Sequence, residues 1–248
     1  MEKESLVVSH ILLQKLLEDI KPALNRILKA AKTDDDVKNF FNRDLNVEYT
    51  EKEHYNIKVF LCCSNINNTI ERIRAISVYV STFPTPKKYS KNGIMKKDWI
   101  AYHYANFEVA KVSLYDSALL LVNQVFVLGL RPQNCNKETV RENEWIKNSK
   151  DIADSIDAIE KVTRESRYPK NLFIHRGILP NLDNIDFLDI FDRTSSYSDL
   201  GISTTELEDL FKMAFQEISE EIKEGLEKLE ANIVKLFDAI LLEYNKQI

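Results

Sequence analysis

A stripe of ten apolar residues runs from Leu207 to Ile240 at the spacing of an α-helix. Its members average about 3.7 positions apart, close to the helical repeat of 3.6. The run opens with Ser203-Thr204-Thr205-Glu206, the spacing of a capping box, in which a hydroxyl and a carboxylate accept backbone N–H groups at a helix start. We predict one helix of about 60 Å that continues to the end of the chain. One domain rarely covers that length, so part of this helix is expected to pack on a partner.

Few breakers interrupt the remaining sequence, because only five Gly and six Pro occur in 248 residues. No stretch alternates apolar and polar residues as a strand does. We predict an all-α protein, an antiparallel helical bundle with a long central hairpin and a long C-terminal helix. Residues 1–95 are expected to form an N-terminal helical extension packed on a core bundle of residues 96–248. Helical patterns cover residues 5–31, 51–80, 98–128 and 138–168, whereas 177–201 reads mostly as loop with a short apolar insert.

Local signals set the expected ends of these helices. Thr50 and Glu53 have capping-box spacing, and Asp98 can cap the helix that follows the lysine-rich segment 87–97. Gly129 is expected to terminate that helix, and Pro22 to kink or divide the first one. Thr33-Asp34-Asp35-Asp36 provides a further helix start.

Charge is distributed unevenly along the chain. The net charge is −5, but the residues from Glu206 onward carry −6, which leaves +1 for everything before them. A basic groove outside the terminal helix is therefore compatible with the composition, although the strong basic signature of a dedicated nucleic-acid binder is missing. Two of the three cysteines are adjacent, so a disulfide scaffold is not expected. With neither a signal-peptide pattern nor an 18-residue apolar run, we expect a cytoplasmic protein that does not enter a membrane.

The sequence lacks the usual signatures of cofactor and metal chemistry. It has no glycine-rich phosphate loop and no paired-cysteine zinc pattern, and its four histidines do not pair at metal-ligand spacing. No serine lies on a glycine-flanked elbow. We therefore expect neither a metal nor a cofactor.

One segment concentrates polar and basic residues of the kind that act on phosphates: Lys170-Asn171-Leu172-Phe173-Ile174-His175-Arg176-Gly177. It follows Pro169, which prevents the preceding helix from continuing regularly. Arg167 lies just before it. If the segment is helical, Lys170 and His175 lie about 140° apart and flank one site rather than share one line. A histidine that titrates near neutrality suits proton transfer, and a fixed cation stabilises charge on phosphorus.

This segment resembles the motif of the HEPN superfamily (higher eukaryotes and prokaryotes nucleotide-binding domain), which is Arg, four to six residues, and His at the end of a helical hairpin. The stretch from Tyr115 to Phe126 is also similar to the preceding helix of one prokaryotic branch. The resemblance covers roughly Asp98 to the C-terminus. It implies metal-independent RNA cleavage, in which His moves a proton, Arg holds the scissile phosphate and the 2′-hydroxyl attacks. It also implies a homodimer whose two motifs face each other.

The resemblance to the HEPN motif implies catalytic roles for His175, Asn171, Lys170 and Arg176. His175 matches the histidine of the motif. Asn171 matches the polar residue that often follows the motif's arginine, and Lys170 occupies the position of that arginine. Lysine binds phosphate as a point charge but lacks the planar fork of arginine, so the replacement is not conservative. Arg176 is a second source of that fork, whereas seven residues separate Arg167 from His175, outside the family's range.

Three further residues are predicted to bind substrate: Arg167, Asp116 and Asn123. Asp116 and Asn123 lie seven apart on one helix face and could support the motif, or they could cap neighbouring loops or face solvent. The cluster Tyr102-His103-Tyr104 could stack on bases, but aromatic residues at helical spacing more often belong to a core.

Three functional hypotheses follow. The first is a metal-independent endoribonuclease or RNA-binding module in prokaryotic phage defence, toxin–antitoxin function or stress response, with a homodimer and an antitoxin or helical protein as partners. The second, from a different class, is a catalytically inactive helical protein for interaction and dimerisation. The third is nucleotide binding without cleavage at the same residues.

Overall fold

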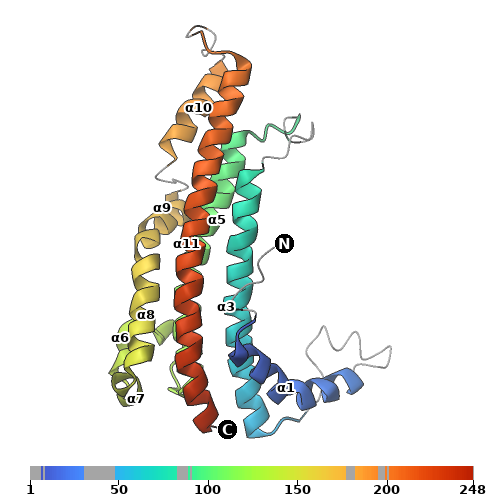
Figure 1. Ribbon diagram of the computed structural model, residues 1–248, viewed down its shortest axis with the longest axis vertical. Helices are drawn as coiled ribbons and strands as arrows, with labels where there is room; N and C mark the ends of the chain where they lie inside the picture. Colours follow the sequence, from blue (N-terminus) through green and yellow to red (C-terminus); the bar gives the residue numbers. More distant parts are fainter. Residues whose placement is uncertain are drawn as a thin grey trace. The chain divides into compact units, whose positions relative to one another are not determined.

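The computed structural model describes residues 7, 9–30, 48–82, 89, 91–176, 182–194, 199 and 201–247, and every regular element within them is helical. The all-α prediction is therefore confirmed (Figure 1). Four helices are long, namely α1 (Ile11–Ala30), α3 (Glu51–Ser81), α5 (Lys96–Val125) and α11 (Thr204–Gln247). The shorter ones are η1 (Pro132–Asn134), α6 (Lys137–Glu142), α7 (Glu144–Asn148), α8 (Lys150–Thr163), η2 (Arg164–Ser166), α9 (Arg167–Arg176) and α10 (Asp183–Thr194).

Both predicted capping boxes form. At the start of α3 the backbone N–H of Glu53 donates to Thr50 Oγ1 (3.2 Å), and the N–H of Thr50 donates to Glu53 Oε2 (2.9 Å). Arg26 also donates to Glu53 Oε2 (2.6 Å), and this bond, together with those from Thr50, lowers the pKa of the Glu53 carboxyl. At the start of α11, Ser203 and Glu206 exchange the same pair of bonds at 2.7 and 3.2 Å. These local signals set both helix starts.

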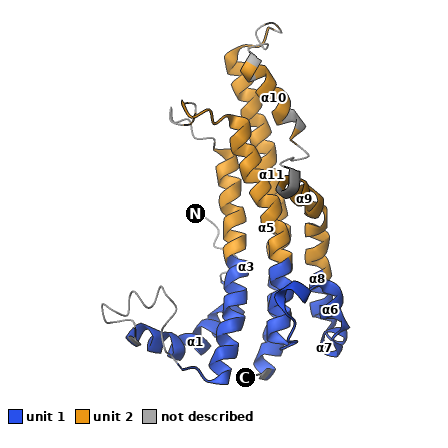
Figure 2. Ribbon diagram, turned by 180° about the vertical axis from the view of Figure 1, so that it is seen from behind, with its two compact units in different colours: residues 1–67, 116–156, 233–248 blue, residues 68–115, 157–232 orange. Residues whose placement is uncertain are grey.

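The chain forms two compact units, and three long helices contribute to both (Figure 2). Unit 1 comprises residues 1–67, 116–156 and 233–248, and unit 2 comprises residues 68–115 and 157–232. Each unit is therefore assembled from segments far apart in sequence, with its own buried core.

Unit 1 packs α1 and the first part of α3 against the last part of α11. His10 hydrogen-bonds to Asp238 (3.0 Å), and the Tyr244 hydroxyl donates to Asp19 (2.9 Å). The ring of Tyr55 stacks on that of Tyr244, with centroids 6.0 Å apart. Fully buried apolar side chains fill the space between these contacts, among them Leu12, Leu16, Ile20, Val59, Ile66, Leu236, Phe237 and Ile240.

Unit 2 packs the second part of α3 and most of α5 against α11. The Tyr104 hydroxyl donates to Glu221 (3.0 Å), and the hydroxyl of Ser219 donates to the backbone carbonyl of Ser77 (3.0 Å). Arg74 pairs with the buried Glu230 at 2.7 Å. The core around these bonds includes Ile70, Ile73, Ile100, Phe107, Leu114, Ile159, Ile222 and Leu229.

The C-terminal end of α5 differs from the prediction. The N–H of Leu128 donates to the carbonyl of Asn123 (3.0 Å) and that of Val127 to Gln124 (3.3 Å), the two bonds of a Schellman cap. Val127 holds the left-handed position of this cap, with φ 51°. The prediction that Gly129 terminates the helix therefore placed the cap two residues too late. Glycine is favoured at such a position, and the chain uses a β-branched residue there.

Other predicted boundaries were also wrong. α5 begins at Lys96, two residues early, and Asp98 lies in its first turn, where it accepts the N–H of Met95 (2.9 Å). The expected single helix over 138–168 is divided into α6, α7, α8, η2 and the start of α9. The first break lies at Asn143, whose side chain caps α7 by accepting the N–H of Trp145. α1 continues through Pro22 without dividing. The expected helix start at residues 33–36 lies outside the described residues.

The segment predicted as mostly loop, residues 177–201, contains the 12-residue helix α10. Leu182, Ile185 and Asp189 are buried at helical spacing, and Arg193 donates to Asp189 (2.8 Å). The apolar insert seen in the sequence is therefore one face of an amphipathic helix.

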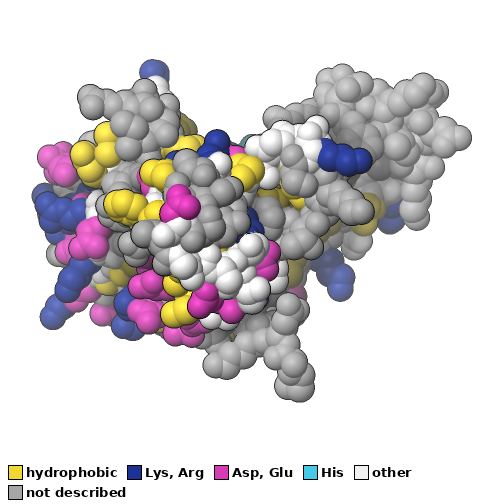
Figure 3. All heavy atoms as spheres, turned by 90° about the horizontal axis from the view of Figure 1, so that it is seen from above, with side chains coloured by type: hydrophobic (Ala, Val, Ile, Leu, Met, Phe, Trp, Pro, Cys, Tyr) yellow, Lys and Arg dark blue, Asp and Glu magenta, His cyan; other side chains and the backbone are white. Residues whose placement is uncertain are grey.

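No helix among the described residues is long and apolar enough to cross a membrane. Seen from above Figure 1, hydrophobic side chains lie at the surface among acidic and basic ones (Figure 3). All three cysteines are free, and burial raises the pKa of the Cys63 thiol. The Cys63 side chain is fully buried.

Candidate functional site

The motif segment lies on α9, which follows α8 through the 3-10 helix η2. Pro169 is the third residue of α9, where a backbone N–H has no partner inside the helix. Proline therefore fits α9 although it could not lie in the interior of a longer helix that continued from α8. The ring of Pro169 is buried, and so is the side chain of Ser166 in η2. This buried side fixes which face of α9 meets solvent.

Arg167 is held against α5 by the ring of Tyr115. The guanidinium carbon of Arg167 lies 5.2 Å from the ring centroid, a cation–π contact. Its Nη2 also lies 4.0 Å from Glu160 Oε1. The Arg167 side chain nevertheless remains 46% exposed. Its charge is positioned and still accessible to a solvent-borne phosphate.

Asn171 is exposed and Lys170 is half-buried on the same helix. Because α9 is helical throughout this stretch, Asn171 and position 175 are four residues apart and share a face. Lys170 and position 175 are five apart, about 140° around the helix. The sequence analysis placed Lys170 and His175 on either side of one site only if the segment was helical for more than one turn. α9 fulfils that condition.

His175 and Arg176 belong to the backbone of α9, but their side chains lie outside the described part of the structure, as does Gly177. The roles assigned to these side chains remain predictions. Their place in the helix follows from the backbone alone.

The stretch around α9 carries positive charge in an acidic protein. From Lys161 to Arg176 the sequence holds five Lys or Arg and one Glu, a net charge of +4 against −5 for the whole chain. Lys161, Arg164 and Arg167 are exposed. A cluster of this kind attracts polyanions electrostatically.

Comparison with known protein families gives one match. The model of the Cthe2314-like HEPN family matches residues 41–240, about four fifths of the chain. The chain belongs to this HEPN family. No curated protein and no solved structure matches it.

The HEPN match extends beyond the region from which the resemblance was inferred. It begins at residue 41, within the segment 1–95 that was expected to be an N-terminal extension, and it includes α3 and all of α5 to α10. Every candidate site residue lies inside it. Residues of both compact units therefore belong to the HEPN match.

The two polar candidates on α5 belong to unit 1, whereas α9 belongs to unit 2. Both amide atoms of Asn123 bond to the backbone of Leu130: Nδ2 donates to its carbonyl (3.0 Å), and Oδ1 accepts its N–H (3.1 Å). Asn123 thus ties down the loop after α5, as its loop-capping interpretation expects. Asp116 is exposed, and its charge adds to burial in raising the pKa of Cys135 to about 11.

Two aromatic residues at α9 had no role in the sequence analysis. Tyr115 supports Arg167, although 52 positions separate them, and a non-local contact of this kind leaves no periodic signal. Tyr168, the second residue of α9, is 68% exposed. The sequence did contain one signal for Tyr168, because it lies three residues before Asn171, a spacing that puts two residues near each other on a helix. In the Tyr102-His103-Tyr104 cluster, His103 and Tyr104 are buried, as expected for a core, whereas Tyr102 is exposed.

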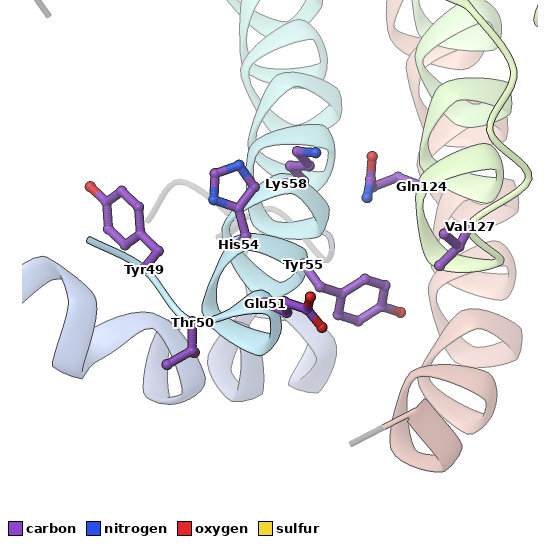
Figure 4. Close-up of a pocket in the computed structure, with 8 residues that line it drawn as sticks. All are labelled: Tyr49, Thr50, Glu51, His54, Tyr55, Lys58, Gln124 and Val127. Atoms are coloured by element: carbon purple, nitrogen blue, oxygen red, sulfur yellow. The ribbon is translucent and has the colours of Figure 1, made fainter. Parts of the chain in front are cut away.

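Unit 1 contains a separate pocket of about 410 Å³ between the first turns of α3 and the end of α5 (Figure 4). Glu51 and Lys58 give its wall mixed charge, and the Tyr55 hydroxyl is engaged with the carbonyl of Val125 (3.0 Å). It lacks the uniform positive charge of α9. Among the described residues, no group of His, Cys, Asp or Glu could hold a metal ion. The full lining is Tyr49, Thr50, Glu51, His54, Tyr55, Lys58, Gln124 and Val127.

Proposed function

We propose that this HEPN protein binds RNA along α9 and cleaves it without a metal ion. The observation that supports this most is the helical α9 itself, which has an exposed Asn171 in register with position 175 and exposed cations beside it. Membership of a HEPN family is consistent with this reaction class, and the net charge of +4 from Lys161 to Arg176 favours attraction of the RNA backbone.

In the proposed reaction His175 takes the proton of a ribose 2′-hydroxyl. The 2′-oxygen attacks the adjacent phosphorus, the bond from phosphorus to the 5′-oxygen breaks, and that oxygen leaves with a proton from solvent. The products are a 2′,3′-cyclic phosphate and a 5′-hydroxyl end. Lys170 and Arg176 stabilise the negative charge that develops on the phosphoryl oxygens, and Asn171 and Arg167 hold the RNA backbone.

Cleavage of a mixed RNA pool in the presence of EDTA tests this proposal. We expect the purified protein to cleave and His175→Ala to lose at least about a hundredfold in rate, the usual contribution of general acid–base catalysis. His54→Ala is the matched control, because His54 is exposed on α3 in unit 1, outside the motif. RNA with 2′-O-methyl groups should resist cleavage, since the attacking hydroxyl is blocked.

Mass spectrometry of the same sample establishes whether a partner has been co-purified. If the partner-free protein leaves RNA intact, the nuclease proposal fails and RNA or nucleotide binding without cleavage takes its place. Calorimetry with RNA and with mononucleotides then separates those two. Equal cleavage by His175→Ala and wild type would instead show that another group moves the proton.

The biological setting follows from the chemistry. A metal-independent ribonuclease that acts on cellular or phage RNA in the cytoplasm fits phage defence, a toxin–antitoxin pair or a stress response in a prokaryote. A ribonuclease of this kind requires restraint, which an antitoxin or another helical protein would provide. Three free cysteines are consistent with a reducing compartment.

The second candidate function is dimerisation or protein interaction without catalysis. Exposed apolar residues favour it: Phe187 and Ile190 on α10, and Leu210 and Met213 on α11, each pair three residues apart on one helix face. We infer that these exposed residues take part in an interface between two copies of the chain. Homodimerisation serves both functions, so the RNA assays rather than the oligomeric state decide between them.

A further inference from the structure

Tyr168 presents an aromatic ring to solvent at the start of α9. Its side chain is 68% exposed, although Ser166 and Pro169 on either side of it are buried. Single exposed aromatic residues are common on protein surfaces and need no explanation by themselves. The position of Tyr168 relative to the motif is what distinguishes it.

The register of α9 puts Tyr168 in line with the motif. Asn171 is three residues further on and position 175 seven further on, and seven residues correspond to nearly two full turns, about 20° short. Along the helix axis Tyr168 and position 175 are roughly 10 Å apart. A few stacked nucleotides, at about 3.4 Å each, cover that distance. A base on Tyr168 and a phosphate at position 175 can therefore belong to one strand.

Cations flank this ring. Arg164 and Arg167 are exposed just before it, and Lys170 follows two residues later. A charged track combined with an aromatic platform is how proteins hold single-stranded nucleic acid, because every unpaired base has a face that can stack. Trp145 on α7 is equally exposed, at 68%, but its own short helix carries one Glu and one Lys and has no net charge.

We propose that Tyr168 stacks on an unpaired base of the RNA and positions the strand for attack near His175. This inference rests on the proposed RNA-binding function of α9. It makes Tyr168 a positioning residue, with the aromatic ring rather than the hydroxyl as the contact.

The test is fluorescence anisotropy with a labelled single-stranded RNA and the full chain, in a His175→Ala background so that the RNA stays intact. Tyr168→Ala is expected to raise Kd about tenfold, within the range measured for loss of one base–aromatic stack. Tyr168→Phe should stay within about twofold of the parent because the ring is retained. Trp145→Ala is the matched control, an equally exposed aromatic residue (68%) on α7, whose helix has no net charge, and it should bind as the parent does.

A fully paired RNA duplex separates stacking from charge. Its bases are occupied, so Tyr168→Ala should leave duplex binding unchanged while it weakens single-strand binding. Equal loss on both RNAs, or equal loss in Tyr168→Phe and Tyr168→Ala, would overturn the stacking role.

The two proposals fail in different ways. If the parent does not bind RNA at all, the proposed function of α9 is lost and the role of Tyr168 with it. If the parent binds but Tyr168→Ala matches Trp145→Ala, only the stacking role is lost.

Discussion

At the scale of single residues, Lys170 is the position at which the sequence analysis expects the arginine of the HEPN motif. A lysine ammonium neutralises a phosphate as a point charge, but it cannot make the two parallel hydrogen bonds of a guanidinium. Lys170 is half-buried on α9, next to the better-anchored Arg167. If Lys170 holds the phosphate as proposed, it supplies positive charge, and a planar fork has to come from a neighbouring arginine such as Arg176.

We expect Lys170→Ala to lower kcat/KM for RNA cleavage at least about tenfold, because the transition state loses a fixed cation. Lys170→Arg should equal or exceed the wild-type rate, since it restores the fork. Lys147→Ala provides the control, an exposed lysine on α7 outside the basic stretch from Lys161 to Arg176. If Lys170→Ala cleaves as wild type does, Lys170 is not the phosphate ligand, and Arg176→Ala becomes the variant to measure.

At the scale of elements, the cap of α5 contains the most strained residue of the described backbone. Val127 is the one non-glycine residue there with positive φ, and its side chain is 65% exposed. The left-handed conformation costs an L-residue roughly 1–2 kcal/mol, and little packing offsets it at an exposed position. The two hydrogen bonds of the cap keep Val127 in place.

Val127→Gly is therefore expected to stabilise the protein by about 0.5–1 kcal/mol, after allowance for the greater freedom of glycine in the unfolded chain. Urea unfolding followed by circular dichroism measures this as a higher midpoint at unchanged slope. Val127→Ala keeps a Cβ in the left-handed region and should gain less. A lower midpoint for Val127→Gly would mean that the valine side chain stabilises the fold through its contacts.

The difference between Val127 and the two capping boxes also explains which boundaries a sequence can reveal. At Thr50 and Ser203 the hydroxyl, the carboxylate and the N–H groups they satisfy lie within four residues, so local spacing predicts the helix start. The cap of α5 depends on a left-handed backbone conformation at Val127, and valine rarely adopts that conformation. The sequence analysis therefore placed the cap at Gly129. At Asn143 the apolar periodicity continues along the sequence, but the helix ends there because the Asn143 side chain caps α7.

The candidate site divides in the same way. The relative positions of Lys170, Asn171 and residue 175 follow from their spacing along one helix, which the sequence contains. The support of Arg167 by Tyr115, and the use of both Asn123 amide atoms by Leu130, depend on how segments meet after folding. α10 was missed for a related reason, since its buried face includes the charged Asp189, which interrupts the apolar pattern.

At the scale of the whole molecule, exposed apolar residues near the start of α11 bear on assembly. The length of α11, 44 residues or roughly 65 Å, is already used within one chain, because the helix contributes to both compact units. Figures 1 and 2 both place α10 beside the first turns of α11. Phe187 on α10 and Met213 on α11 are each more than 60% exposed there. Burying such residues between two copies removes apolar area from water and favours association.

We expect sedimentation velocity to give a particle of about twice the 28.9 kDa of one chain for the wild type. The double substitution Phe187→Ser and Met213→Ser should shift it to the monomer, whereas Leu242→Ser, an equally exposed apolar residue near the end of α11, should not. If the proposed homodimer brings two motifs face to face, the monomeric variant should lose RNA cleavage while α9 still binds RNA. A monomeric wild type, or a double variant that stays dimeric, would remove this surface as the interface, and cleavage by a proven monomer would show that one copy of α9 suffices.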